Sequence, residues 1–216
     1  GSGMVDFQSR EPRTRDDDDS ESEESAEGEN EPENAPDEAA ETVSERGPES
    51  DDPAESLAYA VVTVSGQRSL SEDTQGDTVV EIIENAGAHV TTRDLINASY
   101  DGVQSTITTL AKRDDVDAIV TIGGTGVEPT DVTVEAMEPL FDKRLPGFGE
   151  LFRRLAAADH GSSVVGTRAT AGIVAGAPVF AVPGTIDGAV LATEDIIVQE
   201  AGQLATAAKP PADAEE

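Results

Sequence analysis

A glycine-rich stretch, Thr121-Ile-Gly-Gly-Thr-Gly126, is the part of this 216-residue chain whose residue types and spacing most clearly indicate chemistry. It follows the apolar run 117–120 and precedes Asp131 and a helix-like segment, an order that predicts a strand, a glycine turn and a helix start. Three glycines in four positions expose backbone N–H groups and allow positive φ, so a phosphate could bind against the main chain near the next helix. The alternative is an ordinary tight turn between strand and helix.

Other glycine-loop chemistries fit this stretch poorly. The loop has no Gly-Lys-Ser or Gly-Lys-Thr, which a Walker loop needs, and its spacing differs from the dinucleotide fingerprint. Two further loops, Ser65-Gly66 and Pro183-Gly184, also follow apolar runs. Because ligands bind outside the carboxyl ends of strands in open α/β sheets, we expect the three loops to share one rim.

The elements that would position these loops alternate along the chain. Strand-like runs lie at 59–64, 88–91, 117–121, 172–174 and 179–182. Helix-like runs lie at 78–86, 102–112, 133–141, 148–158 and 188–200. This alternation predicts an α/β fold with a parallel sheet.

Composition divides the chain into three parts. Residues 1–53 hold 20 acidic and 4 basic residues with frequent Ser, Pro and Gly, so we predict a disordered acidic tail, in which residues 1–3 are a cloning remnant. Residues 54–209 are long enough for one domain with a sizeable core, and 210–216 are predicted to be a disordered end. The tail is interpreted as a solvating segment or a partner arm.

The charge of the chain restricts its setting and its partners. The formal net charge is -31 and there are only three lysines, which indicates a protein solvated in concentrated salt and favours a halophile cytoplasm. No basic face is visible for nucleic acid, and the charge disfavours anionic membranes. No apolar run reaches the length of a membrane span and no export signal is present, so we predict a cytoplasmic protein. The absence of cysteine excludes disulfides and thiolate sites.

An ordered series of motifs runs through the predicted domain and covers about 58–199. It comprises Val64-Ser65, Asp73-Thr-Gln-Gly76, T-I-G-G-T-G-V-E-P-T-D over 121–131, Pro139-Leu-Phe141, Pro146-Gly-Phe-Gly-Glu150, Thr167-Arg168 with Ala171-Gly172, and Pro183-Gly184. With these motifs the chain resembles the MoaB/MogA family of molybdenum cofactor biosynthesis proteins, which includes the amino-terminal domain of gephyrin. The run from Pro139 to Leu155 is most similar to the MoaB branch.

The resemblance implies a three-layer α/β fold with a mostly parallel central sheet flanked by helices, usually assembled as a homotrimer or a higher oligomer. It implies an adenylyltransferase that uses Mg-ATP, transfers AMP to the terminal phosphate of molybdopterin and releases pyrophosphate. ATP and molybdopterin are then the small-molecule partners, and a molybdenum-insertion enzyme is a further partner. Such a transfer needs an anion cradle and a metal site.

The resemblance also implies roles for particular residues. The phosphate and nucleotide site would comprise Gly123, Gly124, Thr125, Gly126, Pro183, Gly184 and Thr185. Molybdopterin would be bound by Thr167, Arg168, Ser65 and Asp73. Asp131 would be the catalytic residue and the ligand of Mg²⁺, a cation that prefers oxygen ligands.

Several of these residues have simpler interpretations. Asp131 could cap the helix that follows it, and Arg168 could form a surface ion pair. The helical stripe Phe148, Phe152 and Leu155 is predicted to form an oligomer contact, with core packing as the alternative. His89 and His160 are isolated and are interpreted as structural.

Two departures from the family pattern open alternatives to the enzyme. Thr130 stands where active relatives often have Arg before the motif aspartate, and Asn97-Ala98 stands where several have an acidic pair, for which Asp94 or Asp101 could compensate. The first alternative is a non-catalytic molybdopterin carrier or scaffold. The second, which rests on the same fold acting on a different nucleotide rather than on these departures, is a nucleotide pyrophosphatase of the competence-damage type.

Overall fold

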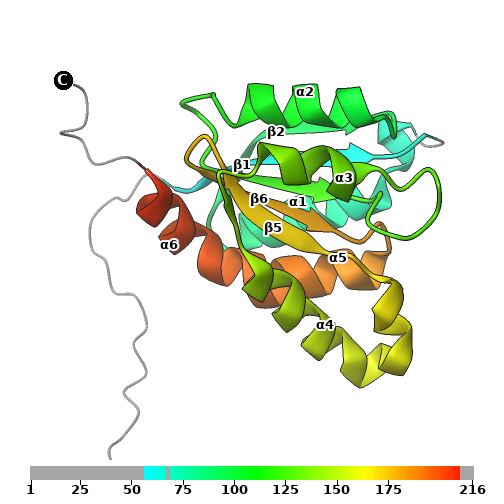
Figure 1. The fold of residues 1–216 in the computed structure, drawn as a ribbon. Helices are drawn as coiled ribbons and strands as arrows, with labels where there is room; N and C mark the ends of the chain where they lie inside the picture. The colour runs from blue at the N-terminus through cyan, green and yellow to red at the C-terminus, as the bar shows by residue number, and fades with distance from the viewer. Residues whose placement is uncertain (1–55, 67–68, 210–216) are drawn as a thin grey trace, which may run out of the picture. The chain divides into compact units, whose positions relative to one another are not determined.

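The computed structural model describes residues 56–66 and 69–209, which form an α/β domain (Figure 1). The predicted acidic tail at 1–53 and the predicted disordered end at 210–216 lie outside the described residues. No helix within the described ranges is long and apolar enough to cross a membrane.

The centre of the domain is a six-stranded, mostly parallel sheet in the order β2-β1-β3-β6-β5-β4. Its strands are β1 Ala58–Val64, β2 His89–Ile96, β3 Ala118–Ile122, β4 Lys143–Arg144, β5 Thr170–Val174 and β6 Ala177–Val182. The first three strands and β6 are parallel, whereas β5 pairs antiparallel with β6, and β4 with β5. The prediction of an α/β fold with a mostly parallel sheet is therefore confirmed.

The antiparallel edge arises from a tight hairpin that the strand pattern did not reveal. Only Ala175 and Gly176 separate β5 from β6, and their φ angles are 48° and 86°. Two consecutive positive φ angles make a two-residue connection whose twist matches that of the paired strands. A parallel pair would need a much longer crossover, so this connection forces β5 to run back along β6.

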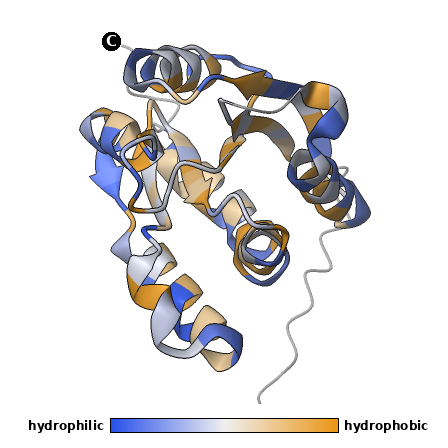
Figure 2. Ribbon diagram, turned by 90° about the vertical axis from the view of Figure 1, so that its right-hand side faces the viewer, coloured by the Kyte–Doolittle hydropathy of each residue, from blue (hydrophilic) through white to orange (hydrophobic). Residues whose placement is uncertain are grey.

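Helices cover both faces of the sheet, which gives three layers (Figure 1). They are α1 Thr74–Asn85, α2 Tyr100–Leu110, α3 Thr133–Met137, α4 Pro146–His160, α5 Ile186–Ala192 and α6 Val198–Ala208, with a π-helix at Thr193–Ile197 between α5 and α6. Short 3₁₀ segments lie at Leu70–Glu72, Glu138–Leu140 and Gly161–Gly166. In Figure 2 the strands are largely hydrophobic, whereas the helices also carry hydrophilic residues.

The two layers of core follow the alternation of side chains along the strands. On β1, Tyr59 and Val61 pack in the cluster under α1, α4, α5 and α6, whereas Ala60 and Val62 pack under α2 and α3. Both sets are fully or almost fully buried, as expected for a strand covered on its two faces. The central strands therefore hold the loops at their ends on a rigid base.

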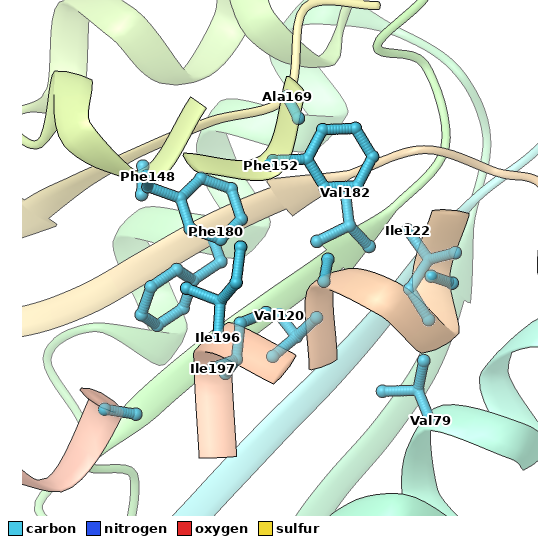
Figure 3. Close-up of a cluster of buried hydrophobic side chains, with 14 of the residues drawn as sticks. Val79, Val120, Ile122, Phe148, Phe152, Ala169, Phe180, Val182, Ile196 and Ile197 are labelled. Atoms are coloured by element: carbon cyan, nitrogen blue, oxygen red, sulfur yellow. The ribbon is translucent and has the colours of Figure 1, made fainter. Parts of the chain in front are cut away.

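The aromatic residues of α4 belong to this core. Phe148 and Phe152 are only 7% and 2% exposed, and the ring centroids of Phe148 and Phe180 lie 5.3 Å apart (Figure 3). Leu155 packs against the same cluster. Core packing accounts for this stripe, so the predicted oligomer contact does not come from Phe148 and Phe152. The predicted trimer itself stays a prediction.

Candidate functional site

Three strand-end loops meet at one rim of the sheet, as the sequence predicts. They follow β1, β3 and β6, and the closest approach between them involves Gly123. A Cβ atom built on Gly123 would lie 2.7 Å from the Val64 carbonyl oxygen, and one on Gly184 would lie 3.1 Å from the Gly123 Cα. The loops can therefore touch only because these two positions are glycine.

Thr133 fixes the shape of the glycine loop through two hydrogen bonds. Its hydroxyl donates to the Gly123 carbonyl at 2.8 Å, and its amide donates to the Gly124 carbonyl at 3.0 Å. Gly123 and Gly124 have φ angles of 99° and 68°, which side chains rarely adopt. Within the described ranges, the amides of residues 124–126 donate no hydrogen bond. These N–H groups are therefore free to bind an anion, and the predicted cradle stays a prediction.

Asp131 belongs to this loop and does not cap the helix after it. One oxygen of its carboxylate, Oδ2, accepts the Glu128 amide at 2.9 Å, and its own amide donates to the Glu128 carbonyl at 2.9 Å. Val132 is the residue before α3, and no side chain caps that helix. The capping alternative for Asp131 is therefore wrong. Since α3 has only five residues, an anion at this loop would depend on the loop amides rather than on a helix dipole.

Two cavities flank the glycine loop and share its carboxylates. The first, which we call the apolar-walled cavity, has a volume of about 640 Å³ and is lined in part by Phe152, Val164 and Leu191. The second, which we call the sheet-edge cavity, has a volume of about 680 Å³ and is lined in part by Ser65 and Thr130. Both cavities are lined by Gly124, Glu128, Asp131 and Gly184. Asp131 thus lies where two ligands could meet.

The residues predicted for the nucleotide side all line the apolar-walled cavity except Gly123. That cavity is lined by Gly124, Thr125, Gly126, Pro183, Gly184 and Thr185, whereas Gly123 lines the sheet-edge cavity. The Thr185 hydroxyl accepts the Gly188 amide at 3.3 Å and so caps α5. The roles of these residues in binding stay predictions.

The residues predicted for molybdopterin do not form one group. Thr167 lines the apolar-walled cavity, and its hydroxyl oxygen is buried without a partner among the described residues. Ser65 lines the sheet-edge cavity, and its amide donates to the Ile96 carbonyl at 2.9 Å. Asp73 and Arg168 line neither cavity.

Asp73 is completely buried beneath the first loop. Its carboxylate accepts the Thr63 hydroxyl at 2.7 Å and the Gly76 amide at 3.1 Å, and it pairs with Arg93 at 3.3 Å. These contacts cap α1 and tie it to β1 and β2. A carboxylate enclosed in this way has no surface for a ligand in this conformation.

Arg168 forms the ion pair that the sequence left open as an alternative. Its guanidinium binds the Glu135 carboxylate, and this contact lowers the pKa of Glu135 below its ordinary value. The same guanidinium donates to the Gly126 carbonyl at 2.8 Å and to the Asp131 carbonyl at 3.2 Å. It lines a third cavity of about 530 Å³, together with Glu135 and Arg153.

Three residues of the site were not singled out from the sequence. Thr133 and Glu135 are ordinary helix residues in the pattern, and only the folded loop shows what they hold. Glu128 lies three residues before Asp131, a spacing that could have indicated a paired carboxylate. His160, interpreted as structural, also lines the apolar-walled cavity.

The carboxylates available to a cation are few. No group of three acidic or histidine side chains with the arrangement of a metal site occurs among the residues that the structure describes. Asp94 and Asp101, which could have compensated for Asn97, line neither the apolar-walled nor the sheet-edge cavity. Ala98 lines the sheet-edge cavity, so the departure at this position does lie beside the site.

Comparison with known proteins shows the family of the chain. Residues 60–203 match a family described as a probable molybdopterin binding domain. Molybdenum cofactor biosynthesis protein B of Bacillus subtilis is 38% identical over 141 residues, which are 65% of this chain and 83% of that protein. The protein of the same name from Escherichia coli K12 is 34% identical over the same shares of the two chains.

Solved structures agree with these relatives. A crystal structure of molybdenum cofactor biosynthesis protein B has a TM-score of 0.69 at 32% identity, over 71% of this chain and 96% of that one. The tungsten cofactor synthesizing protein MoaB from Pyrococcus furiosus has a TM-score of 0.66 at 30% identity, over 72% of this chain and 99% of that one.

Proposed function

The chain belongs to the MoaB/MogA family of molybdenum cofactor biosynthesis proteins, and from this premise we propose that it is a molybdopterin adenylyltransferase. In the proposed reaction, an oxygen of the terminal phosphate of molybdopterin attacks the α-phosphorus of ATP. A P–O bond forms there, the bond from that phosphorus to the bridging oxygen of pyrophosphate breaks, and pyrophosphate leaves. The observation that carries the proposal is that Asp131 and the glycine loop line two adjoining cavities.

The loop amides would stabilise the charge that accumulates during this transfer. The N–H groups of residues 124–126 donate no hydrogen bond to any described residue, which supports their use as a cradle for phosphate oxygens. Thr133 and the positive φ angles hold them in place before any ligand binds, so little reorganisation is needed at the moment of reaction. The apolar wall of Phe152, Val164 and Leu191 suits a flat ring and would exclude water.

The carboxylates of the loop fit a magnesium ion. Asp131 uses one oxygen for the Glu128 amide, and its other oxygen accepts no hydrogen bond from the described residues. Asp131 and Glu128 would hold Mg²⁺, with phosphate oxygens and water completing its shell, since this ion is usually bound by one or two carboxylates and substrate phosphates. When bound, Mg²⁺ would neutralise charge on the phosphates.

The test is adenylyl transfer by the purified full chain with molybdopterin and Mg-ATP in concentrated KCl. Adenylylated pterin and pyrophosphate are followed together. We expect both products in equal amounts, and we expect Asp131→Asn to lower the rate by roughly 100-fold or more, the scale of losing one preorganised electrostatic group. Asp94→Asn is the matched control, because Asp94 is exposed on β2 and lines neither cavity.

The other outcomes identify the alternatives. An unchanged rate in Asp131→Asn would remove this carboxylate from the mechanism. Molybdopterin binding without turnover would indicate a carrier or scaffold, which the Asn97 departure favours. Cleavage of a dinucleotide without pterin would indicate a pyrophosphatase. Sedimentation of the same sample tests the proposed homotrimer.

A further inference from the structure

Arg168 connects three parts of the loop that carries Asp131. Its amide donates to the Thr125 carbonyl at 3.0 Å, and its side chain donates to the carbonyls of Gly126 and Asp131. Nε, Nη1 and Nη2 of its guanidinium all have protein acceptors. A guanidinium used in this way is not available as a free phosphate ligand, which differs from the role that the family resemblance implies.

The main chain and the side chain of Arg168 hold different parts of the loop. Thr125 is held by the main chain and would stay in place if the side chain were removed. Gly126 and Asp131, the two ends of the segment 126–131, are held by the side chain. Inside that segment, the hydrogen bonds among the described residues join only Glu128 and Asp131, so they shape the turn without fixing it to the domain.

Glu135 orients the guanidinium of Arg168. It lies in α3 and accepts from both terminal nitrogens of Arg168, at 3.3 Å from Nη2. Two donors on one carboxylate fix the plane of the guanidinium, which a single contact would leave free to rotate. Glu135 lines neither the apolar-walled nor the sheet-edge cavity. Its effect on the site would therefore pass through Arg168.

We propose that Arg168, oriented by Glu135, is a positioning residue that fixes the Asp131 carboxylate at the junction of the two cavities. The inference rests on the proposed function, since it concerns the same site. Thr133 secures the loop at Gly123 and Gly124, and the Arg168–Glu135 pair secures it from Gly126 to Asp131. A carboxylate that must act on a transferring group needs such a fixed geometry, because a displacement of about 1 Å can cost about 100-fold in rate.

The experiment compares Arg168→Ala, Arg168→Lys and Glu135→Gln with the wild type. Arg154→Ala is the matched control, because Arg154 is an exposed arginine of α4 that lines none of the three cavities. Two quantities are measured on each full-length variant. The first is kcat and KM for adenylyl transfer, and the second is hydrogen exchange of the segment 125–132 in the ligand-free protein.

We expect Arg168→Ala and Glu135→Gln to lower kcat by about tenfold or more while each KM changes by less than about twofold, the pattern of lost positioning rather than lost binding. Arg168→Lys should restore only part of the rate, because an ammonium keeps the charge but cannot form the forked contacts. The double variant Arg168→Ala/Glu135→Gln should be no slower than Arg168→Ala, since both substitutions remove the same interaction.

The exchange measurement keeps this inference separate from the proposed reaction. We expect the hydrogen-bonded amides of the segment 125–132, Glu128 and Asp131, to exchange faster in Arg168→Ala and Glu135→Gln, and to show no change in Arg154→Ala. If the wild type transfers no AMP, the proposed function fails, while the exchange result still tests whether the Arg168–Glu135 pair holds the segment. Unchanged exchange, full rescue by Arg168→Lys, or a rise in KM alone would overturn the positioning role and favour direct binding of the substrate by Arg168.

Discussion

Asp73 and Asp131 are both motif aspartates, but they differ in solvent exposure and therefore in the roles that they can have. Asp131 is partly exposed between two cavities, whereas Asp73 is enclosed by Thr63, Gly76 and Arg93. Both lie in the motifs by which the sequence resembles its family. Those motifs do not distinguish a carboxylate that lines a cavity from one that joins three elements, because that distinction depends on what surrounds each carboxylate in the fold.

Replacing Asp73 should therefore lower stability more than it changes chemistry. We expect Asp73→Ala to reduce the free energy of unfolding by about 2–4 kcal/mol, since it removes a helix cap and leaves a half-buried guanidinium with one partner fewer. Asp77→Ala is the control: Asp77 pairs with the same Arg93 but is 60% exposed, so it should cost about 1 kcal/mol or less. Denaturant unfolding in KCl measures both, and equal effects would contradict this account.

Gly124 illustrates a residue whose importance comes from its missing side chain. A Cβ atom there would lie 2.2 Å from the Thr133 hydroxyl, and its φ is 68°. We expect Gly124→Ala to cost at least about 1–2 kcal/mol in unfolding free energy and to weaken ATP binding measured by calorimetry. Gly147→Ala, where no atom lies within 4 Å of the added Cβ, should be neutral or slightly stabilising. Intact ATP binding in Gly124→Ala would argue against the cradle.

At the scale of elements, the hydrophobic pattern predicted the helices and every described strand except β4, but it often missed where they begin. The first helix was predicted from residue 78 and starts at Thr74, because Asp73 caps it and the polar first turn has no apolar period. The stretch predicted as one helix over 188–200 runs from Ile186 to Ala208 and contains a π-helix. A π-helical turn adds about one residue to an α-helical turn, and such a small change is hard to recognise in the hydrophobic pattern of the sequence.

The same limit applies to the site. The three rim loops and the phosphate cradle could be predicted, because glycine and strand-end patterns are local in sequence. The Arg168–Glu135 pair could not, since its partners are 33 residues apart and belong to segments joined only by the fold. The strand Lys143–Arg144 was also missed, because two polar residues at a sheet edge carry no apolar signal.

The Arg168–Glu135 ion pair, which joins α3 to the segment before β5, should make the stability of the domain depend on pH. Arg168 lowers the pKa of Glu135 below its ordinary value of 4.5. A carboxylate with a depressed folded-state pKa stabilises fully above its unfolded pKa, and this contribution is lost as pH falls through the folded value. Because Glu135 is half exposed, the effect should be small.

We therefore expect the wild type to lose stability faster than Glu135→Gln as pH falls below about 4.5, and the two to run parallel above that range. Chemical unfolding across this range, at constant KCl, measures the difference. Parallel curves throughout would show that the ion pair does not contribute to stability in solution, and would argue against the positioning role of the Arg168–Glu135 pair as well.

At the scale of the whole molecule, acidity is the property that most distinguishes this chain from an ordinary domain. Residues 54–216 carry 25 acidic and 10 basic residues, so the charge does not belong to the first 53 residues alone. Like charges at this density repel, and the repulsion weakens as the screening length falls from about 10 Å at 0.1 M salt to about 3 Å at 1 M. The halophile setting stays a prediction, and the salt dependence of stability can test it.

We expect the melting temperature to rise with KCl from 0.1 M to 2 M, both in the full chain and in a variant lacking residues 1–53. The truncated variant should fold and transfer AMP like the full chain, because the family match begins at residue 60 and every proposed site residue follows it. It should also need less salt for the same melting temperature, since 20 of the 45 acidic residues are removed. A melting temperature independent of KCl would contradict the salt adaptation, and loss of assembly on truncation would assign the acidic segment a role that its charge alone does not predict.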